Sequence, residues 1–305
     1  MNLELLKKLC AIYSPTGDEQ NMKDFLISYV QENMDRWAVR PEIIADDSLQ
    51  DCLMLVFGTP RTAVFVHMDT IGFMVRYQDQ LVPVGSPEID PDMVLVGRDN
   101  KGIIETNIRI DEDHRIFYRL MRGIDTGTYL VFKPDFFCKG DIIRSPYLDN
   151  RIGIWAMLSI MPTIRDGMII FTCGEEAGGG TAGFLTRKMY EDYAICKALI
   201  ADVTWATDGV KPGEGVVLSM RDRYIPRRNF ISQILDIIQK NGVKFQLEVE
   251  DDGSSDGGEI QRSPYPVSWA FIGPPGHDIH SSKESVNIRD VQEMMTLYQI
   301  LLREL

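Results

Sequence analysis

Strand-like and helix-like segments alternate along most of this chain, and one stretch of short β-type segments interrupts them. Ala63–Val66 is a continuous apolar run with the length of a strand buried on both faces. After residue 146 the alternation returns, and helical periodicity recurs in residues 151–161, 181–191, 228–241 and 289–302. Such alternation predicts an α/β fold in which a mixed sheet is sandwiched by helices.

The interrupting stretch covers residues 71–145. Segments such as Phe73–Tyr77 and Thr128–Phe132 alternate at the period of a strand, and turn residues separate them. This pattern predicts a small, barrel-like all-β domain at 71–145, inserted into a discontinuous α/β domain of residues 1–70 and 146–305. Near the N-terminus, Thr16 and Glu19 are spaced as a capping box for a second helix.

The charge balance limits the partners. There are 45 Asp and Glu residues against 32 Lys and Arg, a net charge of −13, which argues against nucleic acid and anionic membrane surfaces. The five cysteines are odd in number and form no C-x-x-C pair, so no disulfide framework is indicated. Lys7 and Lys8 interrupt the apolar start of the chain, as a secretory leader would not. We therefore expect a soluble, cytoplasmic protein.

Side chains that can bind metal or transfer protons recur where the predicted strands end or a helix begins. These residues are His67, Asp69, Asp149, Glu175, Glu176, Asp202 and His280. Singly, each has an ordinary explanation as a cap or a solvated group. In an open α/β sheet, however, the carboxyl ends of the strands meet at one edge, where ligands bind. Carboxylates gathered there would repel one another, and divalent cations would compensate their charge.

The residue types narrow the metal. Imidazole with carboxylate and no thiolate suits Zn²⁺, Co²⁺ or Mn²⁺. His67 and Asp69 are two apart on extended backbone, so Asp69 can accept the second imidazole N–H. Adjacent Glu175 and Glu176 would point apart on extended backbone, one toward a metal and the other toward a water. A carboxylate bridging two ions is the usual core of a two-metal hydrolase.

Five segments resemble the motifs of metallopeptidase family 42, the two-metal glutamyl and deblocking aminopeptidases that assemble into tetrahedral particles. They are Val66–Val75, Leu148–Arg151, Gly174–Gly178, Ile200–Thr204 and Ile279–Glu284. The resemblance implies a zinc-peptidase-like fold and an enzyme that hydrolyses N-terminal residues from peptide substrates. It also implies a homo-oligomer, from dimer to dodecamer, with the β insertion as the subunit contact.

Matched motif by motif, the resemblance implies two divalent ions per chain, with Zn or Co favoured and Mn possible. Asp149 would bridge both ions. The two sites would be completed by His67 with Asp202, and by Glu176 with His280. Glu175 would be the general base on a metal-bridging water and would pass the proton to the leaving amine, and Asp69 would orient His67. Four neighbouring positions depart from the family pattern: Thr70, Asn150, Gly174 and Ser282. These departures concern activity, substrate preference and assembly.

Alternatives stay open. One is a related co-catalytic metallohydrolase, either a carboxypeptidase or an N-deacylase, and another is a catalytically impaired, metal-free scaffold. Gly178–Gly183 matches G-x-G-x-x-G, but the Glu pair would repel a pyrophosphate. Gly253–Gly257 matches G-x-S-x-G, with Asp278 and His280 following as in α/β hydrolases, but we expect no helix directly after this turn.

Overall fold

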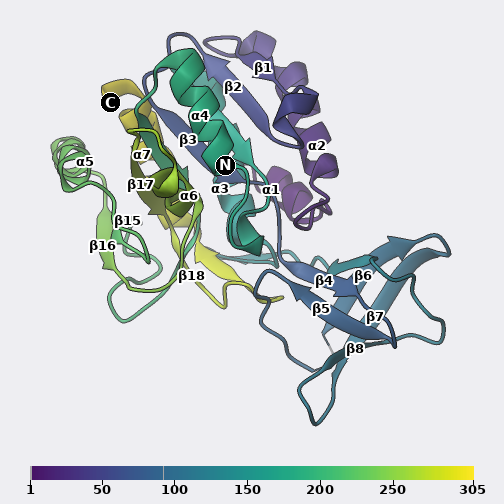
Figure 1. The fold of residues 1–305 in the computed structure, drawn as a ribbon. Helices are drawn as coiled ribbons and strands as arrows, with labels where there is room; N and C mark the ends of the chain where they lie inside the picture. The colour runs from purple at the N-terminus through teal and green to yellow at the C-terminus, as the bar shows by residue number, and fades with distance from the viewer. Residues whose placement is uncertain (1, 92) are drawn as a thin grey trace.

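The computed structural model describes residues 2–91 and 93–305, so Met1 and Asp92, which fall within the predicted domain ranges, lie outside it. An eight-stranded mixed sheet with helices on both faces forms the main body (Figure 1). This architecture confirms the predicted fold class. In order across the sheet, the strands are β1 (Glu42–Ile44), β2 (Leu53–Phe57), β12 (Gly167–Thr172), β3 (Ala63–His67), β13 (Lys197–Ala201), β17 (Ser268–Gly273), β15 (Val216–Arg221) and β16 (Phe245–Val249).

Four parallel strands, β12, β3, β13 and β17, form the middle of this sheet. Every residue of β3 and β12 is buried, as their continuous apolar runs predict. Thr172 pairs with His67, and Ile200 pairs with both Phe65 and Phe271. The carboxyl ends of the four strands therefore lie at the same edge of the sheet.

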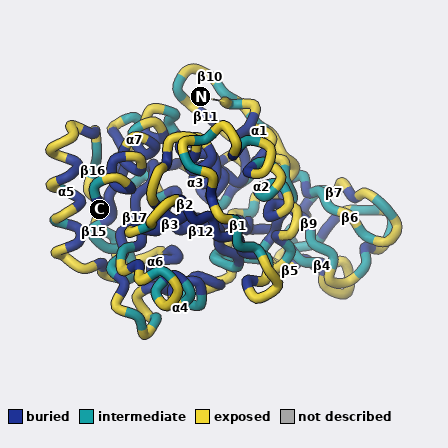
Figure 2. Tube along the Cα trace, turned by 90° about the horizontal axis from the view of Figure 1, so that it is seen from above, coloured by how far each residue is buried: buried dark blue, intermediate teal, exposed yellow. Residues whose placement is uncertain are grey.

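The helices cover the two faces of the sheet. Figure 2 shows α3 and α7 on one side of the buried strands and α4 and α6 on the other. The helices are α1 (Leu3–Cys10), α2 (Gln20–Asn33), α3 (Leu148–Ile160), α4 (Ala182–Tyr193), α5 (Arg228–Asn241), α6 (Asp256–Arg262) and α7 (Ile288–Glu304). Among the described residues, no helix is long and apolar enough to cross a membrane.

Of the strands between β3 and α3, the first six close into a barrel that projects from the main body (Figures 1 and 2). Around the barrel they are β4 (Gly72–Val75), β5 (Gln80–Val84), β8 (Ile116–Arg119), β7 (Gly102–Ile110), β6 (Val94–Asp99) and β9 (Tyr129–Phe132). Phe73, Ile108 and Phe132 belong to a core of its own. The domain limits at residues 71 and 145 stay a prediction.

A second, five-stranded sheet joins the end of the insertion to the C-terminal part of the chain. Its strands in order are β10 (Phe137–Lys139), β11 (Ile142–Arg144), β19 (Ser285–Asn287), β18 (Pro275–His277) and β14 (Thr204–Trp205). The sequence does not predict this sheet, because strands of two or three residues carry no measurable period.

The capping-box expectation at Thr16 and Glu19 is wrong. Helix α2 begins at Gln20, and the side chain of Glu19 makes no capping hydrogen bond. It accepts instead from the backbone N–H of Gly17 at 2.9 Å, while the Thr16 hydroxyl donates to Asp69. Other contacts of the two polar side chains therefore replace the local cap.

Candidate active site

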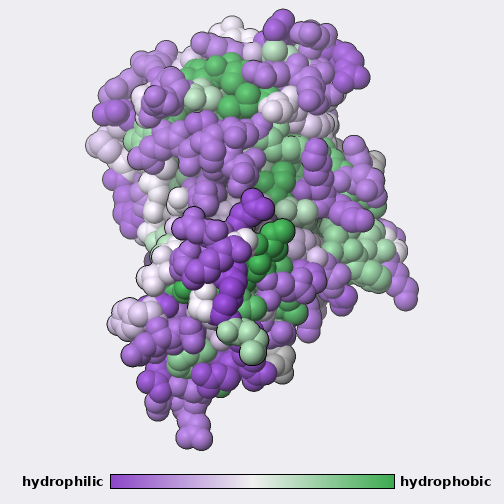
Figure 3. All heavy atoms as spheres, turned by 90° about the vertical axis from the view of Figure 1, so that its right-hand side faces the viewer, coloured by the Kyte–Doolittle hydropathy of each residue, from purple (hydrophilic) through white to green (hydrophobic). Residues whose placement is uncertain are grey.

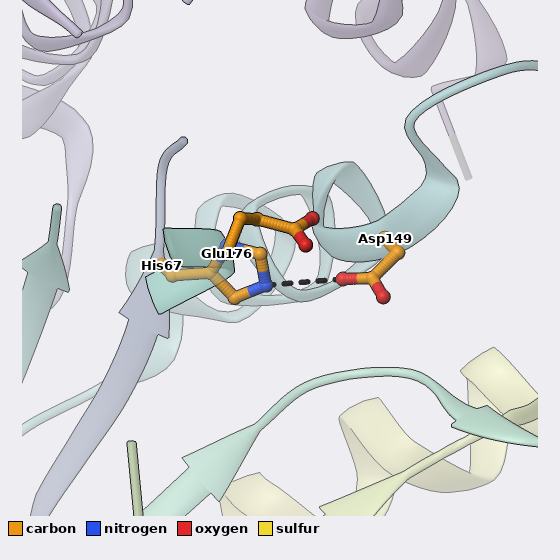
Figure 4. Close-up of side chains that lie close together, drawn as sticks. All are labelled: His67, Asp149 and Glu176. Carbon is orange, nitrogen blue, oxygen red and sulfur yellow. Dashed lines mark hydrogen bonds and ion pairs between the residues drawn. The ribbon is translucent and has the colours of Figure 1, made fainter. Parts of the chain in front are cut away.

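The predicted residues lie close together at the edge of the sheet where the central strands end. His67 ends β3, Asp202 follows β13, and Asp149 lies in the first turn of α3. Glu176 lies in a turn after β12, and His280 lies between β18 and β19. Figure 4 shows the side chains of His67, Asp149 and Glu176 close together.

Asp149 lies between the two histidines. His67 Nε2 is 3.0 Å from Asp149 Oδ1, and His280 Nε2 is 3.4 Å from Asp149 Oδ2. The two oxygens of one carboxylate therefore face two different imidazoles.

A second carboxylate stands beside each histidine. Asp202 Oδ1 is 3.4 Å from His67 Nε2, and Glu176 Oε2 is 3.3 Å from His280 Nε2. The cluster thus divides into two groups that share Asp149.

The Nδ1 atoms of both histidines have partners outside the cluster. His67 Nδ1 is 3.2 Å from the carbonyl oxygen of Asp69 and 3.5 Å from its carboxylate, so the carbonyl is the nearer acceptor. His280 Nδ1 is 2.9 Å from the Ser86 hydroxyl, which the sequence did not indicate. These contacts orient both rings so that Nε2 faces the carboxylates.

The carboxylate of Asp69 holds the Glu175–Glu176 turn. It accepts from the backbone N–H groups of Glu175 and Glu176, each at 3.1 Å, and from the Thr16 hydroxyl at 2.7 Å. The two glutamates lie in a single 3-10 turn, Glu175–Ala177, and the expectation of extended backbone there is wrong. Gly174 precedes the turn at φ +77°, a conformation that favours glycine.

Glu284 binds the backbone of the cluster, and the sequence did not indicate this role. It is fully buried; its Oε2 accepts from the backbone N–H of Asp149 at 3.0 Å and its Oε1 from that of His280 at 3.1 Å. Its place in the Ile279–Glu284 motif was the one available signal. A single side chain therefore positions the backbone at two cluster residues.

Burial and mutual repulsion disturb the protonation of the carboxylates. Burial, followed by the charge of Asp149, raises the pKa of Glu176 to about 7. Burial also raises the pKa of Asp202 to about 7 and that of Glu175 well above its ordinary value. Although burial opposes its charged form, Asp149 and Glu176 raise the pKa of His280 to about 12. Without cations, protons on the imidazoles therefore balance part of the negative charge.

The residues fit a divalent cation. One ligand atom each of His67, Asp149 and Glu176 lies within 4.8 Å of the other two. Glu176 Oε1 is buried and has no hydrogen-bond partner among the described residues. Since a buried carboxylate oxygen without a partner is costly, this atom fits a role as a ligand to a cation.

The G-x-S-x-G segment does not form a nucleophile site, although one argument against it was wrong. A helix, α6, does begin directly after the turn, at Asp256. The Ser255 side chain caps this helix by accepting from the Gly257 N–H at 3.2 Å, and Nδ1 of His280 faces Ser86 instead. Ser255 therefore has a role as a helix cap, and Nδ1 of His280 does not serve it as a base.

Comparisons with known proteins bear on the family and the fold of this chain. A family model described as M42 glutamyl aminopeptidase matches residues 94–297. The fold is similar to aminopeptidase APDkam598 from the archaeon Desulfurococcus kamchatkensis, with a TM-score of 0.86 at 22% identity over 99% of this chain and 94% of that one. It is also similar to the TET1 peptidase of Pyrococcus horikoshii, which can assemble into a tetrahedron or a large octahedral shell. Here the TM-score is 0.83 at 23% identity over 99% of both chains.

Proposed function

Because the chain belongs to the M42 glutamyl aminopeptidase family and is an aminopeptidase, a hydrolase of peptide bonds, we propose that its cluster holds two divalent ions. The residues that would hold them are His67, Asp149, Glu176, Asp202 and His280. Their nitrogen and oxygen donors favour Zn²⁺ or Co²⁺, with Mn²⁺ also suitable. When bound, such ions polarise a carbonyl group and lower the pKa of water toward neutrality.

The observation that carries this proposal is the position of Asp149. Its two oxygens face His67 Nε2 at 3.0 Å and His280 Nε2 at 3.4 Å. A carboxylate shared between two imidazole-containing groups is what a pair of cations needs as a bridge. The unpartnered Oε1 of Glu176 supports the same assignment.

We assign the proton transfers to Glu175. It lines the same cavity as Asp149 and Glu176, and burial raises the pKa of its carboxyl group well above the ordinary value. A carboxylate of this kind can take a proton from the attacking water near neutral pH and then donate it to the leaving amine. Asp69 acts as a positioning residue, because its carboxylate binds the backbone N–H groups of Glu175 and Glu176.

The test combines metal content with turnover. Purified protein should lose cleavage of amino-acid p-nitroanilides with a chelator and regain it with Zn²⁺ or Co²⁺. Glu175→Gln should keep both ions and lose about 10²- to 10⁴-fold in kcat. Near wild-type turnover of this variant would remove Glu175 from the mechanism, and cleavage that persists without ions would remove the metal site.

We also propose that the chain forms a homo-oligomer through its barrel, since the similar TET1 peptidase forms large shells. The barrel segments carry large apolar side chains at the surface, among them Tyr77, Ile103 and Met121. Figure 3, which looks at the side that bears the barrel, shows apolar patches among hydrophilic side chains. Light scattering would measure the particle mass, and a monomer would contradict this proposal. The cytoplasmic location stays a prediction.

A further inference from the structure

The eight-stranded sheet has two edges, and only one of them is protected against pairing with another chain. At the first edge, β1 has three residues, carries the exposed Glu42 and directly follows Pro41. Short edge strands, exposed charges and proline are the usual devices that prevent such pairing. At the other edge, β16 (Phe245–Val249) has five residues and contains neither proline nor lysine. Its Leu247 is 46% exposed and its Val249 is 66% exposed. The edge at β16 therefore lacks the protection that β1 has.

The backbone of β16 directs hydrogen-bonding groups away from the sheet. Within the part of the chain that the structure describes, β16 pairs with β15 alone. Lys244 accepts a hydrogen bond from β15 at 3.2 Å, and Glu250 donates one to it at 3.1 Å. Alternate residues of a strand direct their peptide groups to the same side, so residues 244, 246, 248 and 250 bind β15. The N–H and C=O groups of Phe245, Leu247 and Val249 therefore point to the free edge.

The same three residues carry an apolar stripe along this edge. Phe245, Leu247 and Val249 are two apart, so their side chains lie on one face of the strand. Phe245 packs against the core, whereas Leu247 and Val249 are exposed. Figure 1 shows β16 at one margin of the main body, on the side away from the barrel. The stripe is therefore a different surface from the barrel.

We propose that the free edge of β16 binds a second copy of the chain, with the two β16 strands antiparallel about a two-fold axis at Leu247. In this register Leu247 lies opposite Leu247 of the partner subunit, and Phe245 lies opposite Val249 of the partner subunit. The free N–H and C=O groups of the two strands then bind one another, and the two apolar stripes become one. The contact uses the same surface on both copies, as a two-fold interface requires. It depends neither on the proposed metal site nor on the barrel contact.

The charges at the two ends of β16 favour a second copy as the occupant. Lys244 is exposed, and its Nζ donates to the backbone carbonyl oxygen of Gly213 at 2.8 Å. In the antiparallel register, Lys244 lies opposite Glu250 of the partner subunit, and the two-fold axis repeats this pair of opposite charges. A parallel register would instead place like charges opposite each other. Within one chain, Lys244 and Glu250 are six residues apart along the strand, about 20 Å, so they cannot form this pair themselves.

Particle mass, measured by light scattering on the full chain, tests the contact. Leu247→Lys should lower the mass at least two-fold, because two lysines would face each other at the axis. Val249→Lys should have the same effect and covers the case in which Leu247→Lys does not fold. Gln31→Lys is the matched control, since it adds the same charge at an exposed position of α2, across the main body from β16 (Figure 1). The control should keep the mass of the wild type.

A charge exchange tests the antiparallel register itself. Lys244→Glu should lower the mass at least two-fold, because a glutamate would then lie opposite Glu250 of the partner subunit. Adding Glu250→Lys to this variant reverses both charges and should restore the mass of the wild type. A mass that the exchange does not restore would overturn the register. A mass unaffected by Leu247→Lys, Val249→Lys and Lys244→Glu would overturn the β16 contact and leave the barrel contact standing. A monomeric wild type would overturn both contacts.

Discussion

Replacing Glu284 with Gln should weaken metal binding without touching a proposed metal residue. In the wild type, both carboxylate oxygens accept backbone N–H groups, those of Asp149 and His280. An amide has one oxygen, so one of these N–H groups would face an NH₂ group and lose its acceptor. Glu284 is fully buried, so no solvent replaces the lost acceptor.

The size of the effect follows from that single lost acceptor. Leaving a buried N–H unsatisfied costs about 1–3 kcal/mol. If the free energy of metal binding decreases by this amount, the affinity for Zn²⁺ falls by about 5- to 150-fold. Competition with a chromogenic chelator would measure the affinity, and thermal unfolding would show whether the fold persists.

Glu105→Gln is the matched control. The Glu105 side chain is 57% exposed and pairs with Lys133 at 2.8 Å on the barrel, where such a pair contributes little. The control should bind Zn²⁺ as the wild type does. Zn²⁺ affinity of Glu284→Gln within two-fold of the wild type would refute the positioning role.

Three further outcomes are expected. Asp149→Asn should lower the content of both ions together in metal analysis; loss of one ion alone would contradict a bridge. In the metal-free protein, burial raises the pKa of Glu176 and of Asp202 to about 7, and a raised pKa stabilises the fold while the group is protonated. The unfolding temperature of chelated protein should therefore fall between about pH 5 and pH 8, and added Zn²⁺ should reduce this fall; a rise over the same range would contradict the assignment. Acetylating the substrate amine should remove most of the rate, whereas a carboxypeptidase or deacylase would keep it.

The sequence predicted strands β3 and β12 of the central sheet. Strands β3 and β12 are buried on both faces, so their apolar runs are continuous, and a change to polar residues marks where they end. That change located His67 and the Glu175–Glu176 pair. Because parallel neighbours end at the same edge of the sheet, the order of strands and polar residues along the chain is enough to predict that these side chains meet.

Other elements depend on partners that no local pattern indicates. Strand β2 is as apolar as β3, yet it pairs with β12 more than a hundred residues later in the chain and was not predicted. Glu284 was also missed, because an acidic residue is expected at the surface and its burial depends on two distant backbone N–H groups. The Glu175–Glu176 segment was expected to be extended, and it forms a turn instead. The contact with Asp69 that holds this turn is equally non-local, so no local pattern indicates it.

The barrel joins the main body beside the proposed active site. Strand β4 begins at Gly72, just after Asp69, and the chain returns through Tyr147, whose hydroxyl contacts the backbone of Phe132, just before Asp149. Residues at its base are therefore constrained by the chemistry they border, while its outer loops are under no such constraint. A change in the length of those loops would therefore leave the residues of the proposed active site in place.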